Sequence, residues 1–329
     1  MNFQILMASF HRPKVLEKAL QKIDEIAPDS LDHIHLLLHS SDVHSKSLVE
    51  SLNLSHKISI HIAETKTSPG RSRNILLSHA TTQWVCFLDD DVIVNQDYFL
   101  KANQILREEN CQGFGGPDQA LQGDTLQETM GKLLESSIIM GNTYCRHSLK
   151  ADVSRVADEL MLTLCNFWVD RYWLEKFQIK FSEELLRCEE NLLVDQMKRG
   201  GAVLCFFPQL YVFHLRRTRL EEIFKIQLKS GFFRGVHLSH PESYFKSIFL
   251  IPLLTGFGLA FLPLLAPSLF FLLAKFHFVL NLWINLNIFL KLKSIKGLIF
   301  GMATVVLIHT GFSLGLMLGM IKGKLGVTR

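Results

Sequence analysis

The sequence predicts an α/β domain built on a mainly parallel sheet, followed by an α-helical membrane segment. Up to about residue 220, short apolar runs of strand character alternate with amphipathic helical runs, which is the pattern of βαβ units. Beyond residue 246, long runs contain no charged residue. The length of 329 residues allows about two domains. A hydrophobic content of 48% excludes a disordered chain.

The charge distribution separates the two parts. The whole chain carries 35 basic and 31 acidic residues, but from residue 241 onward there are 8 basic residues and 1 acidic residue. This balance gives no sign of a nucleic-acid partner, and we expect none. We predict a cytoplasmic domain over residues 1–220, an interfacial amphipathic connector over 221–246, and a transmembrane region of two to three helices over 247–329.

The expected strands are short apolar runs. In chain order they cover 3–7, 33–38, 58–62, 84–88, 112–116, 160–169, 202–206 and 210–214. Pro13 suits a first helical turn, and the apolar stripe from Val15 to Ile23 predicts a helix there. Ser68 and Pro69 suit the N-cap and first position of a helix that runs through His79. A polar, partly helical stretch is expected up to about residue 158.

The C-terminal part contains uncharged runs at 247–274, 276–290 and 297–321. About 20 apolar residues are enough to cross a bilayer. Pro263 and Pro267 favour a hairpin of helices at 247–262 and 268–290, which returns the lysines at 291–296 to the side of Lys246. The alternative is one long first span. A third segment, spanning or re-entrant, is expected near 297–321, and the aromatic and basic stretch 230–247 suits an interfacial helix.

The N-terminus and the cysteines indicate the compartment. Met1–Phe10 lacks a basic lead and a cleavage site, so it is expected to form a strand and not a signal peptide. The N-terminal domain should therefore be cytoplasmic. Six widely spaced cysteines without a CxxC pair are expected to be reduced, buried and without function.

Two polar features follow expected strands, and a third begins a helix. Asp89, Asp90 and Asp91 come directly after an apolar strand, where α/β sheets bind ligands, and a cation with a diphosphate would offset their repulsion. The alternative is an acidic loop that caps the helix near Asp97. Glu189 and Glu190 open a helix, where spacing alone favours capping over a catalytic base. His214 ends a strand and is followed by three arginines, so these residues could form a metal or pyrophosphate site. The alternative for His214 is a structural histidine, and the alternative for the arginines is a basic collar at lipid headgroups.

Taken in order, these pieces resemble glycosyltransferase family 2, whose members have a GT-A fold, a nucleotide-sugar-binding doubly wound sheet. The matching pieces lie within about residues 3–220, and some family members also carry C-terminal membrane helices. They are Ala8-Ser9-Phe10-His11-Arg12-Pro13, Gly70-Arg71-Ser72-Arg73-Asn74, Phe87-Leu88-Asp89-Asp90-Asp91, Cys188-Glu189-Glu190-Asn191 and Val212-Phe213-His214.

The resemblance implies inverting transfer of a sugar from a nucleotide-diphosphate donor to a hydroxyl, with Mg²⁺ or Mn²⁺ as cofactor. It implies Glu190 as the catalytic base and Asp118 and Glu189 as acceptor-binding residues. The metal ligands it implies are Asp91, Asp89 and His214. The donor-binding residues it implies are Ser9, Arg12, Asp42, Arg73, Asn74, Asp89 and Asp90.

The sequence departs from the family pattern in three places. The turn after the second strand reads His39-Ser40-Ser41-Asp42, which displaces the acid that contacts the nucleobase towards the next helix. The acidic pair is Glu-Glu where the family commonly has Glu-Asp. The QxxRW signature of processive synthases is absent, since Gln227 is followed by Leu-Lys-Ser-Gly, which favours addition of one sugar per encounter.

The leading interpretation is therefore a non-processive glycosyltransferase at the cytoplasmic face of the inner or plasma membrane. Its acceptor is expected to be a lipid-linked or other membrane glycan, in cell-envelope, exopolysaccharide or glycolipid synthesis, because the membrane segment keeps the site near the bilayer. The alternatives are a nucleotidyltransferase, which the absence of a Gly-rich Lys loop disfavours, and a non-catalytic scaffold that binds nucleotide sugar. A transporter is disfavoured because it leaves the N-terminal domain unexplained.

Overall fold

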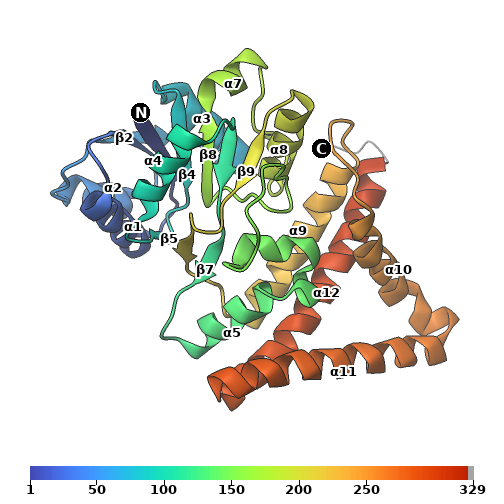
Figure 1. Cartoon of the computed structure of the whole chain (residues 1–329). Helices are drawn as coiled ribbons and strands as arrows, with labels where there is room; N and C mark the ends of the chain where they lie inside the picture. Colours follow the sequence, from blue (N-terminus) through green and yellow to red (C-terminus); the bar gives the residue numbers. More distant parts are fainter. Residues whose placement is uncertain (325–329) are drawn as a thin grey trace. The chain divides into compact units, whose positions relative to one another are not determined.

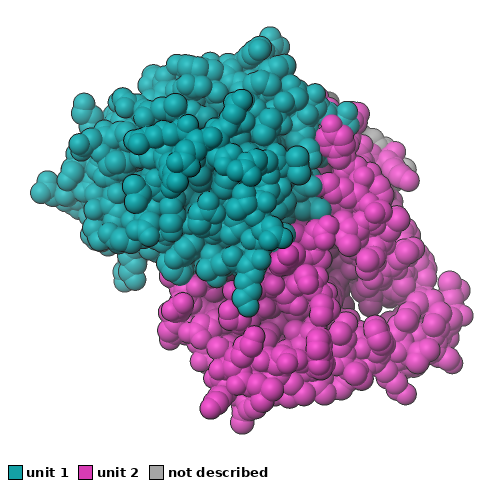
Figure 2. All heavy atoms as spheres, viewed as in Figure 1, with its two compact units in different colours: residues 1–119, 145–215 teal, residues 120–144, 216–329 magenta. Residues whose placement is uncertain are grey.

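The computed structural model describes residues 1–324 and divides the chain into two compact units (Figure 2). Unit 1 contains Met1–Gln119 and Cys145–Leu215. Unit 2 contains Ala120–Tyr144 and the chain from Arg216 onward. The domain bounds predicted above are a different division and stay a prediction.

Unit 1 alternates strands and helices, as the hydrophobic pattern predicts (Figure 1). Its strands are β1 Phe3–Ala8, β2 Leu31–His39, β3 Ile58–Ala63, β4 Trp84–Leu88, β5 Val92–Val94, β6 Gly113–Gly115, β8 Asn166–Asp170, β9 Leu204–Phe206 and β10 Val212–His214, with β7 Asp118–Ala120 running into unit 2. Its helices are α1 Pro13–Ile26, α2 Val43–Ser51, α3 Pro69–His79, α4 Tyr98–Glu108, α7 Arg171–Lys176 and α8 Glu189–Arg199. The Ser68 hydroxyl caps α3 and Pro69 begins it, which confirms the predicted start.

The main sheet has seven strands in the order β3-β2-β1-β4-β8-β6-β9. Neighbouring strands are parallel except at β8, which is antiparallel to both β4 and β6. A second sheet has the order β5-β10-β7, with β10 antiparallel to β5. The predicted mainly parallel α/β sheet is confirmed.

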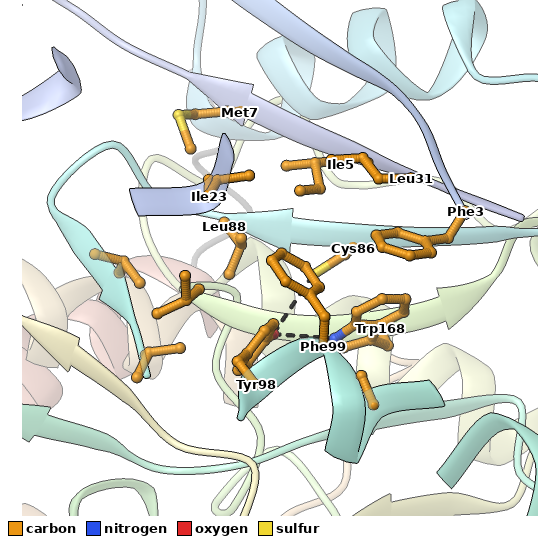
Figure 3. Close-up of a cluster of buried hydrophobic side chains, with 14 of the residues drawn as sticks. Phe3, Ile5, Met7, Ile23, Leu31, Cys86, Leu88, Tyr98, Phe99 and Trp168 are labelled. Carbon is orange, nitrogen blue, oxygen red and sulfur yellow. Dashed lines mark hydrogen bonds between the residues drawn. The ribbon is translucent and has the colours of Figure 1, made fainter. Parts of the chain in front are cut away.

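Hydrophobic clusters lie on both faces of the main sheet, because successive side chains of a strand point to opposite faces. Phe3, Ile5 and Met7 belong to one cluster, and Leu6 belongs to the other. In the first cluster the buried Tyr98 hydroxyl accepts a hydrogen bond from Trp168 Nε1 at 3.0 Å (Figure 3). The same hydroxyl donates to Asn166 Oδ1 at 2.6 Å. This polar network is satisfied inside an apolar core, so it fixes α4 against β8 without an unpaired buried group.

The structure corrects the expected strand at 160–169. The strand covers only Asn166–Asp170, because the chain turns at Asp158. The Asp158 carboxylate accepts from the backbone N–H of Leu160 at 2.8 Å, and its carbonyl accepts from Leu162 N–H at 3.0 Å. Such local bonds compete with a sheet ladder. The short strands β5 and β7 were not predicted, since three residues show no hydrophobic period.

Unit 2 is helical in the part of the chain that the structure describes. It contains α5 Thr125–Leu134, α6 Ser137–Met140, α9 Leu220–Leu238, α10 Leu250–Leu265, α11 Pro267–Leu292 and α12 Ile295–Lys324, with 3₁₀ helices at Gly141–His147 and Ser247–Phe249. The helix expected at 230–247 instead begins at Leu220 and ends at Leu238, because Pro241 cannot extend it.

Three helices of unit 2 are long and apolar enough to cross a membrane by length and composition: Ser247–Leu265, Pro267–Leu292 and Ile295–Lys324. The expected break between the first two is confirmed at Pro267, which begins α11, but Pro263 does not end the first helix: it lies inside α10, which continues to Leu265. The third is a continuous helix of 30 residues. Half of its most apolar window is buried, against 11% and 17% in the other two.

Candidate active site

The aspartate triplet lies at the carboxyl end of β4, beside the end of the parallel strand β1. Ser9, which follows β1, donates its hydroxyl to Asp90 Oδ2 at 2.6 Å. Arg12 lies 2.7 Å from Asp90 Oδ1 through Nη2 and 2.5 Å from Asp91 Oδ2 through Nη1. The structure therefore brings four of the predicted residues into one hydrogen-bonded group.

The carboxyl groups of this triplet differ in the direction of their pKa shifts. Burial raises the pKa of Asp90 to about 6, although Arg12 and Ser9 oppose the shift. Burial acts in the same direction on Asp91, but there the hydrogen bond to His214 and the charges of His214 and Arg12 outweigh it and hold the pKa well below the usual range. Asp91 is therefore ionised at neutral pH and is the strongest anionic ligand of the three.

His214 reaches the triplet through the second sheet. It ends β10, whose antiparallel register sets it opposite Val92, directly after Asp91. Its Nε2 lies 3.1 Å from Asp91 Oδ1 and its Nδ1 lies 3.0 Å from Asp118 Oδ2. Burial lowers the pKa of the imidazole, but the hydrogen bonds to Asp118 and Asp91 outweigh it and raise the pKa well above its ordinary value. The ring is thus held between two carboxylates.

Asp91 and His214 form a donor set that fits a divalent cation. Mg²⁺ and Mn²⁺ accept carboxylate oxygens, and Mn²⁺ also accepts imidazole nitrogen. The two carboxylate oxygens of Asp91 that a metal ion would use are paired with the cationic groups of Arg12 and His214. Asp89 lies near enough for the charge of Asp91 to raise its pKa, although burial is the larger cause.

A second set of donor atoms involves the other side of His214. Among the described residues, one atom each from Asp118, Cys165 and His214 lie within 4.8 Å of one another. Burial raises the pKa of Cys165 to about 11, with the charge of Asp118 adding to the shift, so sulfur remains a thiol at neutral pH. A thiol is a poor ligand for a hard cation. The chemistry therefore favours Asp91 and His214 Nε2 as ligands, with Asp118 orienting the imidazole.

The acidic pair lies at the start of α8, after Cys188 in the left-handed region at φ 66°. Glu189 is 4% exposed and its Oε1 accepts a hydrogen bond from Arg73 Nη1, whereas Glu190 is half-buried. The other nitrogen of the same guanidinium, Nη2, lies 3.7 Å from Asp89 Oδ1. Arg73 thereby connects the acidic pair to the aspartate triplet.

The environment of Glu189 favours its neutral form. Burial raises its pKa to about 7, the neighbouring charge of Glu190 adds to the shift, and Arg73 opposes it. Glu189 is buried and held by Arg73, and Glu190 is the more accessible member of the pair. The role of Glu190 as the catalytic base stays a prediction.

Two other predicted donor-binding residues have partners within the fold. Asp42 is 1% exposed, and its carboxylate accepts from the backbone N–H of His11 at 2.6 Å and of Ser45 at 3.2 Å. The Asn74 side chain pairs with both backbone groups of Phe181 at 3.0 Å. Their donor-binding roles stay predictions.

Asp118, predicted to bind the acceptor, is 3% exposed and contacts His214, His147 and Cys165. His147 and Cys165 are not among the predicted site residues, and the pairing of Asp118 with His214 is not predicted from the sequence. No pattern signals these contacts, because each residue comes from a different segment. The acceptor-binding role of Asp118 stays a prediction.

Comparison with known proteins identifies the domain that carries this site. Residues 4–163 match the family described as Glycosyl transferase family 2. The N-terminal domain belongs to glycosyl transferase family 2. No curated protein matches the chain. The family match covers the aspartate triplet and Arg73 and ends before the acidic pair.

Solved structures with the same fold share little sequence with this chain. A mannosyltransferase from Pyrobaculum calidifontis, in complex with GDP-Man and Mn²⁺, aligns over 99% of this chain and 88% of its own, at TM-score 0.63 and 12% identity. TarS 1-349 from S. aureus aligns over 71% of this chain at TM-score 0.53 and 16% identity. That alignment covers 65% of the TarS chain, less than two thirds of its length. These likenesses show the GT-A fold.

Proposed function

We propose that this family 2 glycosyltransferase is an inverting, non-processive, metal-dependent enzyme that transfers one sugar from a nucleotide diphosphate to a hydroxyl at the membrane. The observation that carries the proposal is the position of Arg73. Its guanidinium lies between Asp89 of the triplet and Glu189 of the acidic pair, so a donor held by the triplet and an acceptor activated by Glu190 meet at one place. Two neighbours by fold were solved with UDP-GlcNAc and with GDP-Man.

The chain's own residues supply the steps of a single displacement. Glu190 removes the proton of the acceptor hydroxyl, whose oxygen attacks the anomeric carbon as the bond to the diphosphate breaks. Inversion follows from attack opposite the leaving group. Ser9 and Arg12 hold Asp90 and Asp91 in place. Asp91 and His214 would hold a divalent cation, and the cation would supply positive charge for the leaving diphosphate.

The location that we propose is a cytoplasmic domain attached to the inner or plasma membrane by the apolar helices of unit 2. The acceptor is a lipid-linked or other membrane glycan in envelope, exopolysaccharide or glycolipid synthesis. The α10–α11 turn is uncharged, whereas Lys246 precedes α10 and Lys291 ends α11. By the positive-inside rule this distribution supports a cytoplasmic position for both lysines.

Donor binding tests the proposal. Melting shifts of detergent-purified protein should be recorded with UDP-, GDP-, dTDP- and CMP-sugars, with and without Mn²⁺ or Mg²⁺. A ligand at a hundredfold excess over Kd stabilises the folded state by about 2.7 kcal/mol. We expect a metal-dependent shift with one nucleotide-diphosphate sugar, abolished by Asp91→Ala and retained by Asp97→Ala. Asp97 is the matched control because its side chain is exposed and does not cap α4.

Measuring sugar transfer distinguishes the proposed role of Glu190 as base from binding of the donor. Glu190→Gln should keep the donor-dependent melting shift and lose transfer to acceptor-containing membranes. Normal turnover in Glu190→Gln would contradict the base assignment. If no donor shifts the melting temperature of the wild-type protein, the result would contradict donor binding and favour a scaffold that binds a partner over the enzyme.

A further inference from the structure

The helix α9, which carries charged side chains, packs along α12. The glycines of α12 at 311, 315 and 319 alternate with Gly231 and Gly235 of α9, so the two backbones approach closely over much of their length. A Cβ atom built on Gly315 would lie 2.1 Å from the carbonyl oxygen of Leu228, and one on Gly319 would lie 1.9 Å from that of Phe232. Any depth that α12 reaches in a membrane is therefore shared by α9.

The helix α9 is unsuited to the hydrocarbon core. It carries Glu221, Lys225 and Lys229 with exposed side chains, and Glu221 pairs with Lys225. Charged side chains in lipid are rare and costly, and α9 lacks the apolar run of a membrane span. Because α12 packs closely against α9, it can have at most one face in contact with lipid.

The burial of α12 fits contact on one face. Three of its large exposed apolar side chains, Ile295, Ile299 and Val306, lie on one face of its first half at helical spacing. Leu318 and Ile321 are exposed near its end. On the same face of its second half Ser313 is buried, and a Cβ built on Gly256 of α10 would lie 2.4 Å from the Ser313 carbonyl oxygen. Other sides of α12 pack against α5 and α9, and the Thr129 hydroxyl of α5 lies 2.8 Å from a Cβ built on Gly297. One apolar face along a helix with a buried opposite face is typical of a helix lying in the membrane interface.

The middle of α12 is also polar. His309 is near the midpoint of the helix, and its Nδ1 lies 2.9 Å from His277 Nε2 of α11. Its other nitrogen, Nε2, lies 3.1 Å from the carbonyl oxygen of Ile139 in α6. In a spanning helix this position would be at the centre of the bilayer, where ionisable groups are most costly.

Basic residues occur at both ends of α12 and at the start of α10. Lys293 and Lys296 lie at its beginning, Lys322 and Lys324 at its end, and Lys246 precedes α10. The α10–α11 turn, from Leu264 to Leu269, is uncharged and its leucines are exposed. Within unit 2, α10, α11 and α12 form a triangle whose one uncharged corner is that turn (Figure 1).

We propose that α12 does not cross the bilayer but lies with α9 along its cytoplasmic surface, with lysines at both ends of α12 contacting anionic lipid headgroups. The exposed apolar stripe of α12 enters the acyl region, and α10 with α11 forms the inserted hairpin. Lys/Arg side chains near an anionic leaflet favour such contact. This topology rests on the proposed function only in calling this surface of the membrane cytoplasmic.

The test is the sidedness of three engineered cysteines, each compared with the labelling of the wild-type protein. Asp29→Cys marks the glycosyltransferase domain, Lys293→Cys the beginning of α12, and Lys322→Cys its end. Sealed right-side-out and inverted vesicles are treated with a membrane-impermeant maleimide. We expect all three to label in the same vesicle orientation and to be protected in the other. Labelling of Lys322→Cys from the side opposite to Asp29→Cys would overturn the proposal.

A depth measurement covers the case in which a lysine variant is poorly produced. A fluorophore on Val306→Cys, in the exposed stripe near the middle of α12, is quenched by lipids brominated at different acyl positions. Strongest quenching by shallow bromines is expected, and strongest quenching by bromines at the acyl ends would overturn the proposal. Neither measurement uses a sugar donor, so an inactive enzyme contradicts the proposed function and leaves this topology unaffected.

Discussion

Asp118 and His214 face each other across the candidate site, with Asp118 Oδ2 3.0 Å from His214 Nδ1. The same imidazole presents Nε2 to Asp91 Oδ1 at 3.1 Å. A carboxylate behind a histidine fixes the ring and its tautomer, and such partners tune the affinity of a metal held by the other nitrogen. Asp118 is therefore a positioning residue for the proposed cation.

Replacing Asp118 should weaken metal binding while leaving the direct ligands in place. In Asp118→Asn the amide can no longer hold His214 as a charged partner, and we expect Mn²⁺ affinity to fall about 10- to 100-fold. Electron paramagnetic resonance of free Mn²⁺ measures it directly. Asp124→Asn is the control, because Asp124 caps α5 and asparagine caps equally well. Equal affinities in the two variants would contradict the positioning role.

Cys165 separates the two candidate donor sets. If the cation is held by Asp91 and His214, Cys165→Ser should keep Mn²⁺ affinity within about twofold, since a thiol with a raised pKa contributes no thiolate. The same resonance titration applies. A loss as large as that of His214→Gln would instead assign the cation to Asp118, Cys165 and His214.

The acidic pair should set the acid limb of the pH–rate profile. Removing the charge of Glu189 takes a like charge from beside Glu190 and frees Arg73 to face it, and both changes favour ionised Glu190. The acid limb of kcat/KM in Glu189→Gln should therefore move to lower pH than in the wild type. Profiles of both enzymes from pH 5 to 9 measure it. A limb that moves to higher pH would show that the two carboxyl groups are not coupled in this way.

Loss of Arg73 should destabilise the protein more at high pH. The folded-state pKa of Glu189, about 7, is above its ordinary 4.5, so the folded state binds more protons in that window and stability falls as pH rises through it. Arg73→Met leaves an uncompensated buried carboxylate above the window, which costs about 3–5 kcal/mol. Below it the group is neutral and the cost shrinks.

Melting temperatures at pH 6 and pH 8.5 measure this difference. Arg71→Met, on the same helix but with an exposed side chain, is the matched control and should melt like the wild type at both values. A pH-independent loss in Arg73→Met would mean that Arg73 acts through packing and not through its charge.

The close approach of α9 and α12 predicts unequal effects of two glycine-to-alanine changes. Gly315→Ala adds a methyl group 2.1 Å from the Leu228 carbonyl oxygen, and such overpacking costs about 1–3 kcal/mol. Gly258→Ala in α10, where the nearest atom is a Leu262 methyl at 3.4 Å, should be neutral or stabilising because alanine favours helices. Melting temperatures in detergent compare them, and equal values would contradict the packing.

Local patterns in the sequence were enough to predict the strands and helices that have a regular hydrophobic period or a clear capping residue. Apolar runs predicted the strands around Phe3, Trp84 and Leu204, Ser68-Pro69 predicted the start of α3, and Pro267 predicted the break between α10 and α11. Each depends on neighbours within a few residues, where propensity and hydrophobic period act directly. The position of the aspartate triplet at a strand end follows from the same pattern.

Contacts between distant segments were decided by the tertiary structure alone. Asp118 meets His214 because the short strands β7 and β10 join one sheet, and Arg73 meets Glu189 because α3 and α8 lie together. The glycine spacings of α9 and α12 are visible in the sequence, but their pairing is not. The sequence by itself determined which segments form strands and helices, since those depend on local forces. Which side chains share a site depends on how the whole chain packs.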